Sequence, residues 1–275
     1  MKDMRGTTAV VTGASRGIGV HIARALVREG VNLSLAARSE EELEVVRKEM
    51  ASLGVKAIAT RCDVTSAEDR ATLIDRTQAE LGPIDILINN AGIETVSRFH
   101  EAEEDDLVRT LEVNLVAAML LTRAVLAGML DRQRGHIVNI ASGAGQGRRV
   151  LRGCVCDQQA RHGRAHQFAP MRIPQKPRRI LRGVPGFCHE TGMYARWENE
   201  GARAPKIAGR STPEKVAEVV IKCILKNRSE LLVNTPPIRP LVVLANIAPR
   251  ITPLAMKLFG YSRTFERAIE IDSRT

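Results

Sequence analysis

Short apolar runs alternate with amphipathic stretches through the first half of the chain, and this alternation constrains the fold more than any other feature. The apolar runs are rich in β-branched residues, as strands are, whereas the stretches between them repeat apolar residues every three or four positions, as helices do. The predicted strands are 7–11, 31–37, 56–62, 84–89 and 135–141. The predicted helices are 20–28, 40–53, 67–81 and 107–130. Because strands that alternate with helices pair in parallel through crossover connections, the pattern predicts an α/β fold with a doubly wound parallel sheet.

The chain is long enough to form one domain of this kind. Its 275 residues include 44% hydrophobic positions, which can bury a full core. We therefore predict a single Rossmann-like domain over residues 1–235, followed by an apolar C-terminal extension over residues 236–275. No unbroken apolar run reaches the roughly 18 residues of a membrane-spanning helix, and the first residues lack the apolar core of a signal peptide. These features predict a cytoplasmic protein whose five cysteines are free thiols.

The regular pattern stops at a basic segment in the middle of the chain. The net charge is +10, and most of the excess lies in residues 148–182, where Asp157 is the single acid. The prolines that would interrupt a helix there are Pro170, Pro174 and Pro177. We therefore expect residues 148–187 to be irregular and to depart from the pattern of the rest of the domain.

Regular structure is predicted again in the last third of the chain. Ser211 or Thr212, followed by Pro213, is typical of a helix start, so we predict a helix at 214–226 and then a strand at 230–234. The stretch 238–261 is apolar but broken by prolines, and its basic residues are Arg239, Arg250 and Lys257. It could pack in the core or at a subunit interface, line a hydrophobic substrate pocket, or make peripheral membrane contact.

Three polar motifs follow the ends of predicted strands. Residues 12–19 (TGASRGIG) join the first strand to the first helix, residues 62–65 (CDVT) follow the third strand, and residues 89–92 (NNAG) end the fourth. Ligands of parallel sheets bind at this carboxyl edge, and glycines let a pyrophosphate approach the N–H groups of a helix N-terminus. The glycine run alone would fit a plain structural turn equally well. Together, the three motifs predict a dinucleotide site.

In this order and spacing, these motifs resemble those of the short-chain dehydrogenase/reductase (SDR) family, over roughly residues 7–144 and 185–234. The resemblance implies an oxidoreductase that interconverts an alcohol and a ketone or aldehyde by hydride transfer. It also implies that the glycine loop holds the pyrophosphate, that Asp63 binds the adenine and that residues 89–92 brace the sheet beside the ribose. The predicted cofactor-binding residues are Gly13, Ser15, Arg16, Gly17, Ile18, Gly19, Arg38, Asp63, Val64, Asn90, Ala91, Gly92, Pro185, Gly186 and Thr191.

The end of the second predicted strand indicates which cofactor is bound. A free ribose 2′-hydroxyl is usually bound by an acid at this position, whereas a 2′-phosphate is bound by arginine. The strand here ends in Ala36-Ala37-Arg38, and Arg16 in the glycine loop could supply a second cation. The sequence thus predicts NADP in preference to NAD. The alternative is that both arginines are solvated surface charges.

The resemblance also implies a catalytic Asn, Ser, Tyr and Lys, of which the chain contains the first two. Asn114 and Ser142 match, but the tyrosine expected about 13 residues after the serine is Val155, and the lysine four residues later is Gln159. The remaining tyrosines, Tyr194 and Tyr261, are not followed by lysine at that spacing. The predicted catalytic residues are therefore Asn114 and Ser142, without the proton donor that hydride transfer to a carbonyl requires.

The missing pair lies within the basic segment, which suggests one cause for both. Our hypothesis is that part of residues 148–187 is translated in a shifted reading frame. Codons for residues 150–160, shifted by one nucleotide, can encode YCEAAYATSK, which places a tyrosine at position 155 and a lysine four residues later. The shifts could lie in the gene or in its sequencing. In either case the chain as written would keep the cofactor half and lose most of its activity.

Three other functions were weighed. Cys154, Cys156, His162 and His166 could form a metal site, but the two cysteines are too close together for a usual zinc knuckle, so no metal is predicted. The basic segment has one stacking aromatic, Phe168, so it predicts non-specific attraction to nucleic acid and no specific recognition. The main alternative is a catalytically inactive dinucleotide-binding protein.

The family resemblance implies a small hydrophobic alcohol or carbonyl substrate and a homo-oligomer formed through the long helices.

Overall fold

A computed structural model describes residues 3–94, 97–98, 100–141, 180–185, 187–188, 193–205, 210–227, 230–233 and 261–272. Its centre is a seven-stranded sheet in the order β3-β2-β1-β4-β5-β6-β9, in which every neighbouring pair is parallel. The strands are β1 (Thr8–Thr12), β2 (Asn32–Ala37), β3 (Ala57–Arg61), β4 (Ile84–Asn89), β5 (His136–Ile140), β6 (Ile180–Pro185) and β9 (Glu230–Val233). The predicted single-domain, doubly wound α/β fold is confirmed.

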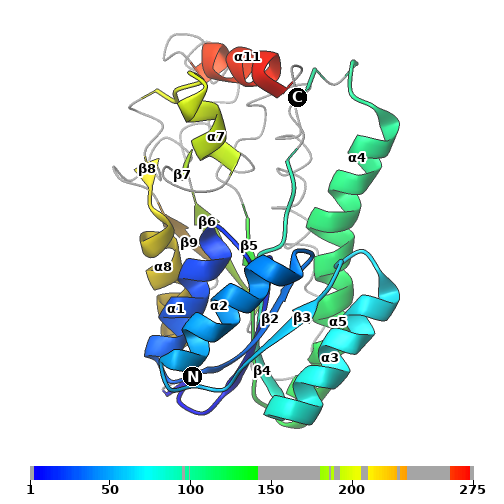
Figure 1. Ribbon diagram of the computed structural model, residues 1–275, viewed down its shortest axis with the longest axis vertical. Helices are drawn as coiled ribbons and strands as arrows, with labels where there is room; N and C mark the ends of the chain where they lie inside the picture. The colour runs from blue at the N-terminus through cyan, green and yellow to red at the C-terminus, as the bar shows by residue number, and fades with distance from the viewer. Residues whose placement is uncertain are drawn as a thin grey trace.

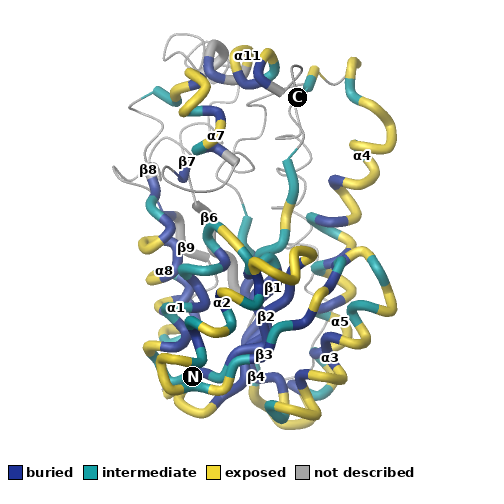
Figure 2. Tube along the Cα trace, in the orientation of Figure 1, coloured by how far each residue is buried: buried dark blue, intermediate teal, exposed yellow. Residues whose placement is uncertain are grey.

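Helices cover both faces of the sheet (Figure 1). One layer holds α1 (Ile18–Arg28), α2 (Glu40–Ser52) and α8 (Pro213–Lys226). The other holds α3 (Ala67–Leu81), α4 (Glu104–Leu111), the π-helical turn η1 (Glu112–Val116) and α5 (Ala117–Asp131). Two hydrophobic clusters, one under each layer, hold the sheet between them, and Figure 2 shows the buried central strands. Because β1 and β4 are buried along their whole length, only their ends can carry a site.

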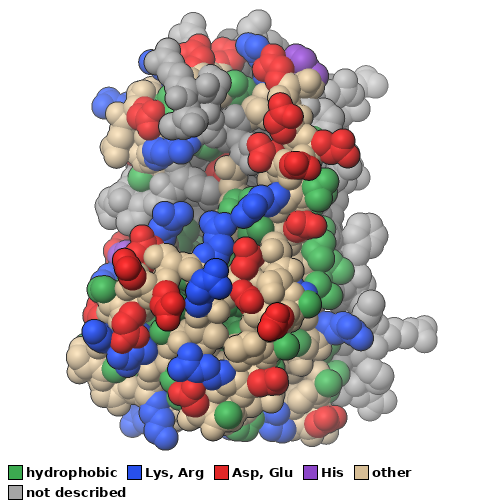
Figure 3. Space-filling model, turned by 45° about the vertical axis from the view of Figure 1, so that its right-hand side comes forward, with side chains coloured by type: hydrophobic (Ala, Val, Ile, Leu, Met, Phe, Trp, Pro, Cys, Tyr) green, Lys and Arg blue, Asp and Glu red, His purple; other side chains and the backbone are tan. Residues whose placement is uncertain are grey.

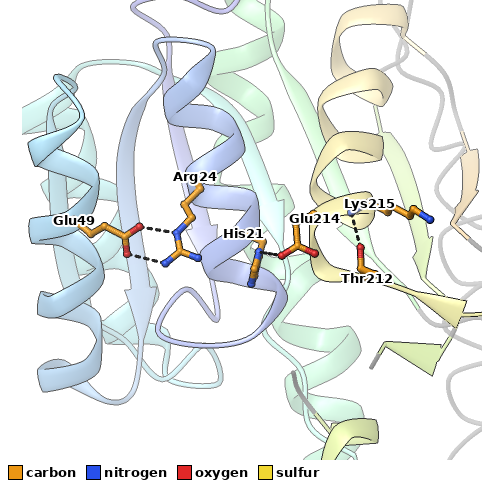
Figure 4. Close-up of polar contacts among 6 residues, drawn as sticks. All are labelled: His21, Arg24, Glu49, Thr212, Glu214 and Lys215. Carbon is orange, nitrogen blue, oxygen red and sulfur yellow. Dashed lines mark hydrogen bonds and ion pairs between the residues drawn. The ribbon is translucent and has the colours of Figure 1, made fainter. Parts of the chain in front are cut away.

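Polar contacts join the three helices of the first layer (Figure 4). Arg24 of α1 donates to both carboxylate oxygens of Glu49 on α2, at 2.6 and 3.0 Å. His21, one turn earlier, lies 2.9 Å from Glu214 of α8. As predicted, Thr212 caps α8, since its hydroxyl accepts from the Lys215 N–H at 3.3 Å. Helix α1 is thereby held on both sides, which fixes the start of the helix that follows the glycine loop.

The α4–η1–α5 helix is longer than predicted. Its 28 residues, Glu104–Asp131, are long and apolar enough to cross a membrane by length and composition alone, which the count of unbroken apolar runs did not detect. In this fold Val113, Leu121 and Val125 are buried in one cluster with Leu87 of β4 and Ile137 of β5. The helix thus forms a layer of the α/β sandwich.

Residues beyond the carboxyl edge of the sheet form a smaller unit that the sequence did not predict (Figure 1). It contains the paired strands β7 (Phe187–Cys188) and β8 (Arg210–Ser211), with helices α7 (Met193–Asn199) and α11 (Tyr261–Asp272). Tyr194 and Trp197 of α7 are buried with Ala268 and Ile271 of α11. The predicted C-terminal extension therefore has a helix at its end, and its apolar stretch 238–260 lies outside the described residues.

The expectation of irregular structure over 148–187 is wrong for residues 180–185. These form β6, which pairs with β5 on one side and β9 on the other, so the sheet continues through this position. Its sequence repeats with neither the helix period nor the strand period, but two parallel neighbours supply backbone partners that the local sequence does not reveal. The rest of the basic segment, up to residue 179, lies outside the described residues.

Candidate functional site

Thr12 and Asn90 tie the glycine loop to the end of β4. The Thr12 hydroxyl accepts from the N–H groups of Asn90 and Ala91, both at 3.0 Å, and donates to the Ile88 carbonyl at 3.2 Å. The Asn90 amide donates back to the carbonyls of Thr12 and Gly13, each at 3.0 Å. These bonds hold the ends of β1 and β4 together at the point where the strand order reverses, which is where ligands of such sheets bind.

Two glycines allow this close approach. A Cβ on Gly13 would lie 2.9 Å from the Ala91 Cα, and Gly13 also has a φ of +64°. A Cβ on Gly19 would lie 2.2 Å from the Gly13 carbonyl oxygen. Neither contact is tolerable for a real side chain, because backbone atoms cannot move aside cheaply. Gly13 and Gly19 are therefore required to fold the loop over the end of β1.

The N-terminus of α1 can accept an anion. Helices α2, α3 and α8 each begin with acidic residues in the first turn, and α3 and α8 also have a side-chain cap. In contrast, α1 follows Gly17, whose φ is +61°, and has neither an acid in its first turn nor a side-chain cap. The positive end of its dipole is left uncompensated beside the glycine loop, and its free N–H groups fit a pyrophosphate.

Asp63 is fixed in place just beyond β3. Its backbone N–H donates to Asp69 at 2.7 Å, and one of its carboxylate oxygens accepts from the Thr65 N–H and hydroxyl, at 3.0 and 2.7 Å. Partial burial acts to raise the pKa of this carboxyl, but the Thr65 bonds and the positive charges of Arg38 and Arg109 together lower it. Asp63 is thus ionised at neutral pH and held rigidly, as an acceptor for an adenine amino group should be.

Arg16 and Arg38 both lie at the carboxyl edge and are exposed. Within the described part of the chain, neither forms an ion pair with a carboxylate. The position of Arg38 is set by β2, because the Ala36 carbonyl accepts from Ala14 at 3.1 Å and the Ala37 carbonyl accepts from Cys62 at 2.9 Å. The glycine loop and the residues after β3 therefore flank Arg38, and both arginine charges remain available to a ligand.

Both ends of the Asn114 carboxamide bond to the backbone of Ile93. Its amide oxygen accepts from the Ile93 N–H and its amide nitrogen donates to the Ile93 carbonyl, both at 2.8 Å. Gly92 makes room for this clasp, since a Cβ there would lie 3.2 Å from the Asn114 oxygen. Asn114 sits within η1, where the helix widens. In this geometry Asn114 positions the loop after β4.

The structure brings most of the predicted residues to one edge of the sheet. Val64 is buried in the cluster under α3 and α5, Ile18 packs on the opposite cluster, and Ser15 is half-buried in the glycine loop. Pro185 ends β6 opposite Val233 of β9. The predicted residues that lie outside the described part are Ser142, Gly186 and Thr191, together with positions 155 and 159.

Sequence reasoning missed the residues that hold the predicted ones. Thr12 was seen only as part of the motif, although a hydroxyl at the end of a buried strand is a signal for such a tie. Thr65 and Asp69, which fix Asp63, could have been suspected from the capping sequence at the start of α3. The bond from Asn114 to Ile93 has no local signal, because it joins positions far apart in the chain.

The chain matches the family model described as short chain dehydrogenase over residues 7–154, a match that ends inside the basic segment. The ketoacyl reductase HetN of Nostoc sp. is 35% identical over 267 residues, which is 94% of this chain and 91% of that protein. Several other curated relatives match over only 50–53% of this chain and 46–62% of their own length.

Solved structures agree with this assignment. The alcohol dehydrogenase of the archaeon Thermococcus sibiricus, complexed with 5-hydroxy-NADP, superposes with a TM-score of 0.71 at 27% identity, over 84% of this chain and 97% of that one. The actinorhodin polyketide ketoreductase with NADPH gives a TM-score of 0.69 at 29% identity, over 83% and 95%. The chain therefore belongs to the short-chain dehydrogenase/reductase family and is by family an NAD(P)-dependent oxidoreductase.

Proposed function

We propose that this protein is an NADP-dependent reductase that interconverts a hydrophobic alcohol and its ketone or aldehyde. The observation that carries the choice of NADP is the end of β2, where Arg38 stands in place of an acid and forms no ion pair among the described residues. A ribose 2′-phosphate needs cationic partners here and would be repelled by an acid. The two solved relatives described above contain NADPH or an NADP derivative, which supports the same choice.

The described residues account for binding and orientation of the cofactor. The first turn of α1 would receive the pyrophosphate, Asp63 the adenine, and Arg16 with Arg38 the 2′-phosphate. When bound, the nicotinamide supplies or accepts the hydride. The Thr12–Asn90 tie fixes the floor of this site, and the Asn114–Ile93 clasp fixes the loop beside it. NAD would bind the same site without the phosphate contacts, and we place it second.

The proton donor decides whether the chain as written turns over substrate. Val155 and Gln159 occupy the positions at which the family resemblance implies tyrosine and lysine. The second candidate function is accordingly an SDR-like protein that binds the dinucleotide without catalysis. Removing one member of a catalytic unit commonly costs several orders of magnitude in rate. The contacts with the pyrophosphate and the adenosine have no such requirement, because they come from the residues that follow β1, β2, β3 and β4.

The proposal is tested by one experiment on the gene and by binding and activity assays on the protein. Resequencing codons 145–190 shows whether the reading frame encodes YATSK. The chain as written is then titrated with NADPH and assayed with a panel of hydrophobic ketones, beside a V155Y/Q159K double variant. NADPH binding without turnover supports a catalytically inactive protein, and turnover by a frame-restored chain supports the reductase. If NADH binds and NADPH does not, the choice of cofactor is wrong.

We also propose a cytoplasmic homo-oligomer. The α4–η1–α5 helix exposes a row of apolar side chains, and Figure 3 shows hydrophobic side chains along the side of the molecule that this helix forms. The exposed members are Val108, Leu111, Val116, Met119, Leu120 and Leu130. An apolar strip on this scale favours burial against another surface. Analytical ultracentrifugation would give the mass in solution, and a monomer at all concentrations would contradict the proposal.

A further inference from the structure

Arg109 of α4 is a third arginine at the adenosine end of the site, and the motifs did not predict it. Arg16, Arg38 and Arg109 come from three separate elements, and all three are exposed. None of them forms an ion pair or a side-chain hydrogen bond within the part of the chain that the structure describes. In Figure 3 the side of the molecule that carries α4 is turned toward the viewer, and Lys and Arg side chains gather across the middle of this face.

The packing of α4 brings Arg109 to the same edge of the sheet as Asp63. Val113 lies one turn after Arg109 on the same side of the helix, because residues four apart share a helix face. Val113 is buried in one hydrophobic cluster with Val64, the residue that follows Asp63. Arg109 therefore stands one turn further out from the core than Val113, toward the open edge. Its charge and that of Arg38 both help to lower the pKa of the Asp63 carboxyl.

Arg109 does not pair with the acids of its own helix. Asp105, Asp106 and Glu112 lie three or four residues from it, a spacing at which opposite charges readily pair. Such pairs do form elsewhere in the described chain, as between Arg76 and Glu80 at 2.6 Å. Arg109 has no such contact, although three acids are within helical reach. Its guanidinium donors are therefore unused among the described residues, while its charge acts on Asp63.

We propose that Arg109 determines cofactor specificity by completing, with Arg16 and Arg38, a three-arginine site for the adenosine 2′-phosphate. The inference rests on the proposed NADP dependence and adds a residue to that site. An ionised Asp63 and a phosphate dianion together carry three negative charges and repel one another, and Arg16 and Arg38 offset only two of these charges. The guanidinium of Arg109 offsets the third and adds charge-assisted hydrogen bonds.

The test measures dissociation constants by isothermal titration calorimetry, with the full chain and three probes: NADPH, NADH and adenosine 2′,5′-bisphosphate. In R109Q we expect the dissociation constants of NADPH and the bisphosphate to rise about tenfold, as for the loss of a charge-assisted hydrogen bond at an exposed site. NADH should bind as before. R109K keeps the charge and should lose only part of the affinity, because lysine lacks the planar fork.

R123Q is the matched control. Arg123 is exposed on α5 of the same long helix, so its loss changes the net charge equally while leaving the site untouched. Circular dichroism checks that each variant keeps its helices. Equal binding of NADPH by R109Q and R123Q overturns the inference, as does an equal loss of NADPH and NADH affinity in R109Q. If the unaltered chain binds NADH but neither phosphorylated probe, the proposed NADP dependence itself fails.

Discussion

Replacing Thr12 with valine should destabilise the whole domain, because its hydroxyl is the centre of the tie between β1 and β4. Thr12 is 1% exposed, and its oxygen accepts two backbone N–H groups at 3.0 Å. Valine has the same shape, so T12V removes the bonds and leaves the packing. The N–H groups of Asn90 and Ala91 then lose their acceptor, and each unsatisfied group costs about 1–3 kcal/mol. Since both groups are only partly buried, we expect a loss of about 3 kcal/mol in the free energy of unfolding.

The control is T12S, which keeps the hydroxyl and removes one methyl group, at a cost of about 1 kcal/mol. Urea denaturation followed by circular dichroism reports the helices of the main domain. Fluorescence of Trp197, the one tryptophan in the sequence, reports the α7–α11 unit separately. T12V should unfold at lower urea than T12S, and it should also bind NADPH more weakly because Asn90 no longer fixes Gly13. Equal losses in the two variants would refute the reasoning, since the bonds of the Thr12 hydroxyl would then contribute no more than one buried methyl group.

Three further predictions concern other parts of the domain. Thr212→Ala should lower the free energy of unfolding by about 1 kcal/mol through loss of the α8 cap, and T212S should restore it in urea denaturation. Asp63→Asn keeps an acceptor for Thr65 but loses the charge. Because the pKa of Asp63 is lowered in the folded state, its ionic contribution is full above the ordinary aspartate pKa of about 4 and is lost as pH falls through the folded value, so wild type and D63N should converge in stability on acidification. Burial raises the pKa of Cys62 to about 12 and that of Cys223 to about 11, so mass spectrometry should find both unalkylated by iodoacetamide until the chain is unfolded.

The cofactor half of the fold was predictable because its signals are local. The first five strands are short apolar runs, and the first three helices repeat apolar residues every three or four positions. Parallel strands must then bring their carboxyl ends to one edge of the sheet. The motifs at those ends then converge without further information. The bonds that fix them were not predictable. Thr12 bonds to Asn90, which lies 78 residues later in the chain. The clasp between Asn114 and Ile93 coincides with a π-helical turn, which the spacing of apolar residues does not predict.

The remainder of the fold depends on partners that are distant in sequence. Strand β6 follows a basic, proline-broken stretch and is specified by β5 and β9 on either side of it. Helix α11 begins at Tyr261, and its Thr264 hydroxyl donates to the Arg203 carbonyl 61 residues earlier. Arg109 was passed over for a related reason. A basic residue among the acids of an exposed helix face indicates a solvated ion pair, and only the burial of Val113 and Val64 in one cluster, together with the effect of Arg109 on the Asp63 pKa, relates it to Asp63.

These placements separate cofactor binding from catalysis in this chain. The groups that would hold the pyrophosphate and the adenosine follow β1, β2, β3 and β4, so their binding does not depend on residues 148–179. The described tyrosine nearest in sequence to the missing one cannot replace it, because the Tyr194 hydroxyl accepts from the Ala204 N–H at 2.6 Å and its ring is buried against α11. Tyr194 therefore does not supply the proton donor that the family resemblance implies at position 155. The chain as written should bind NADPH and turn over little, and restoring tyrosine at position 155 and lysine at position 159 should recover turnover without changing the NADPH dissociation constant.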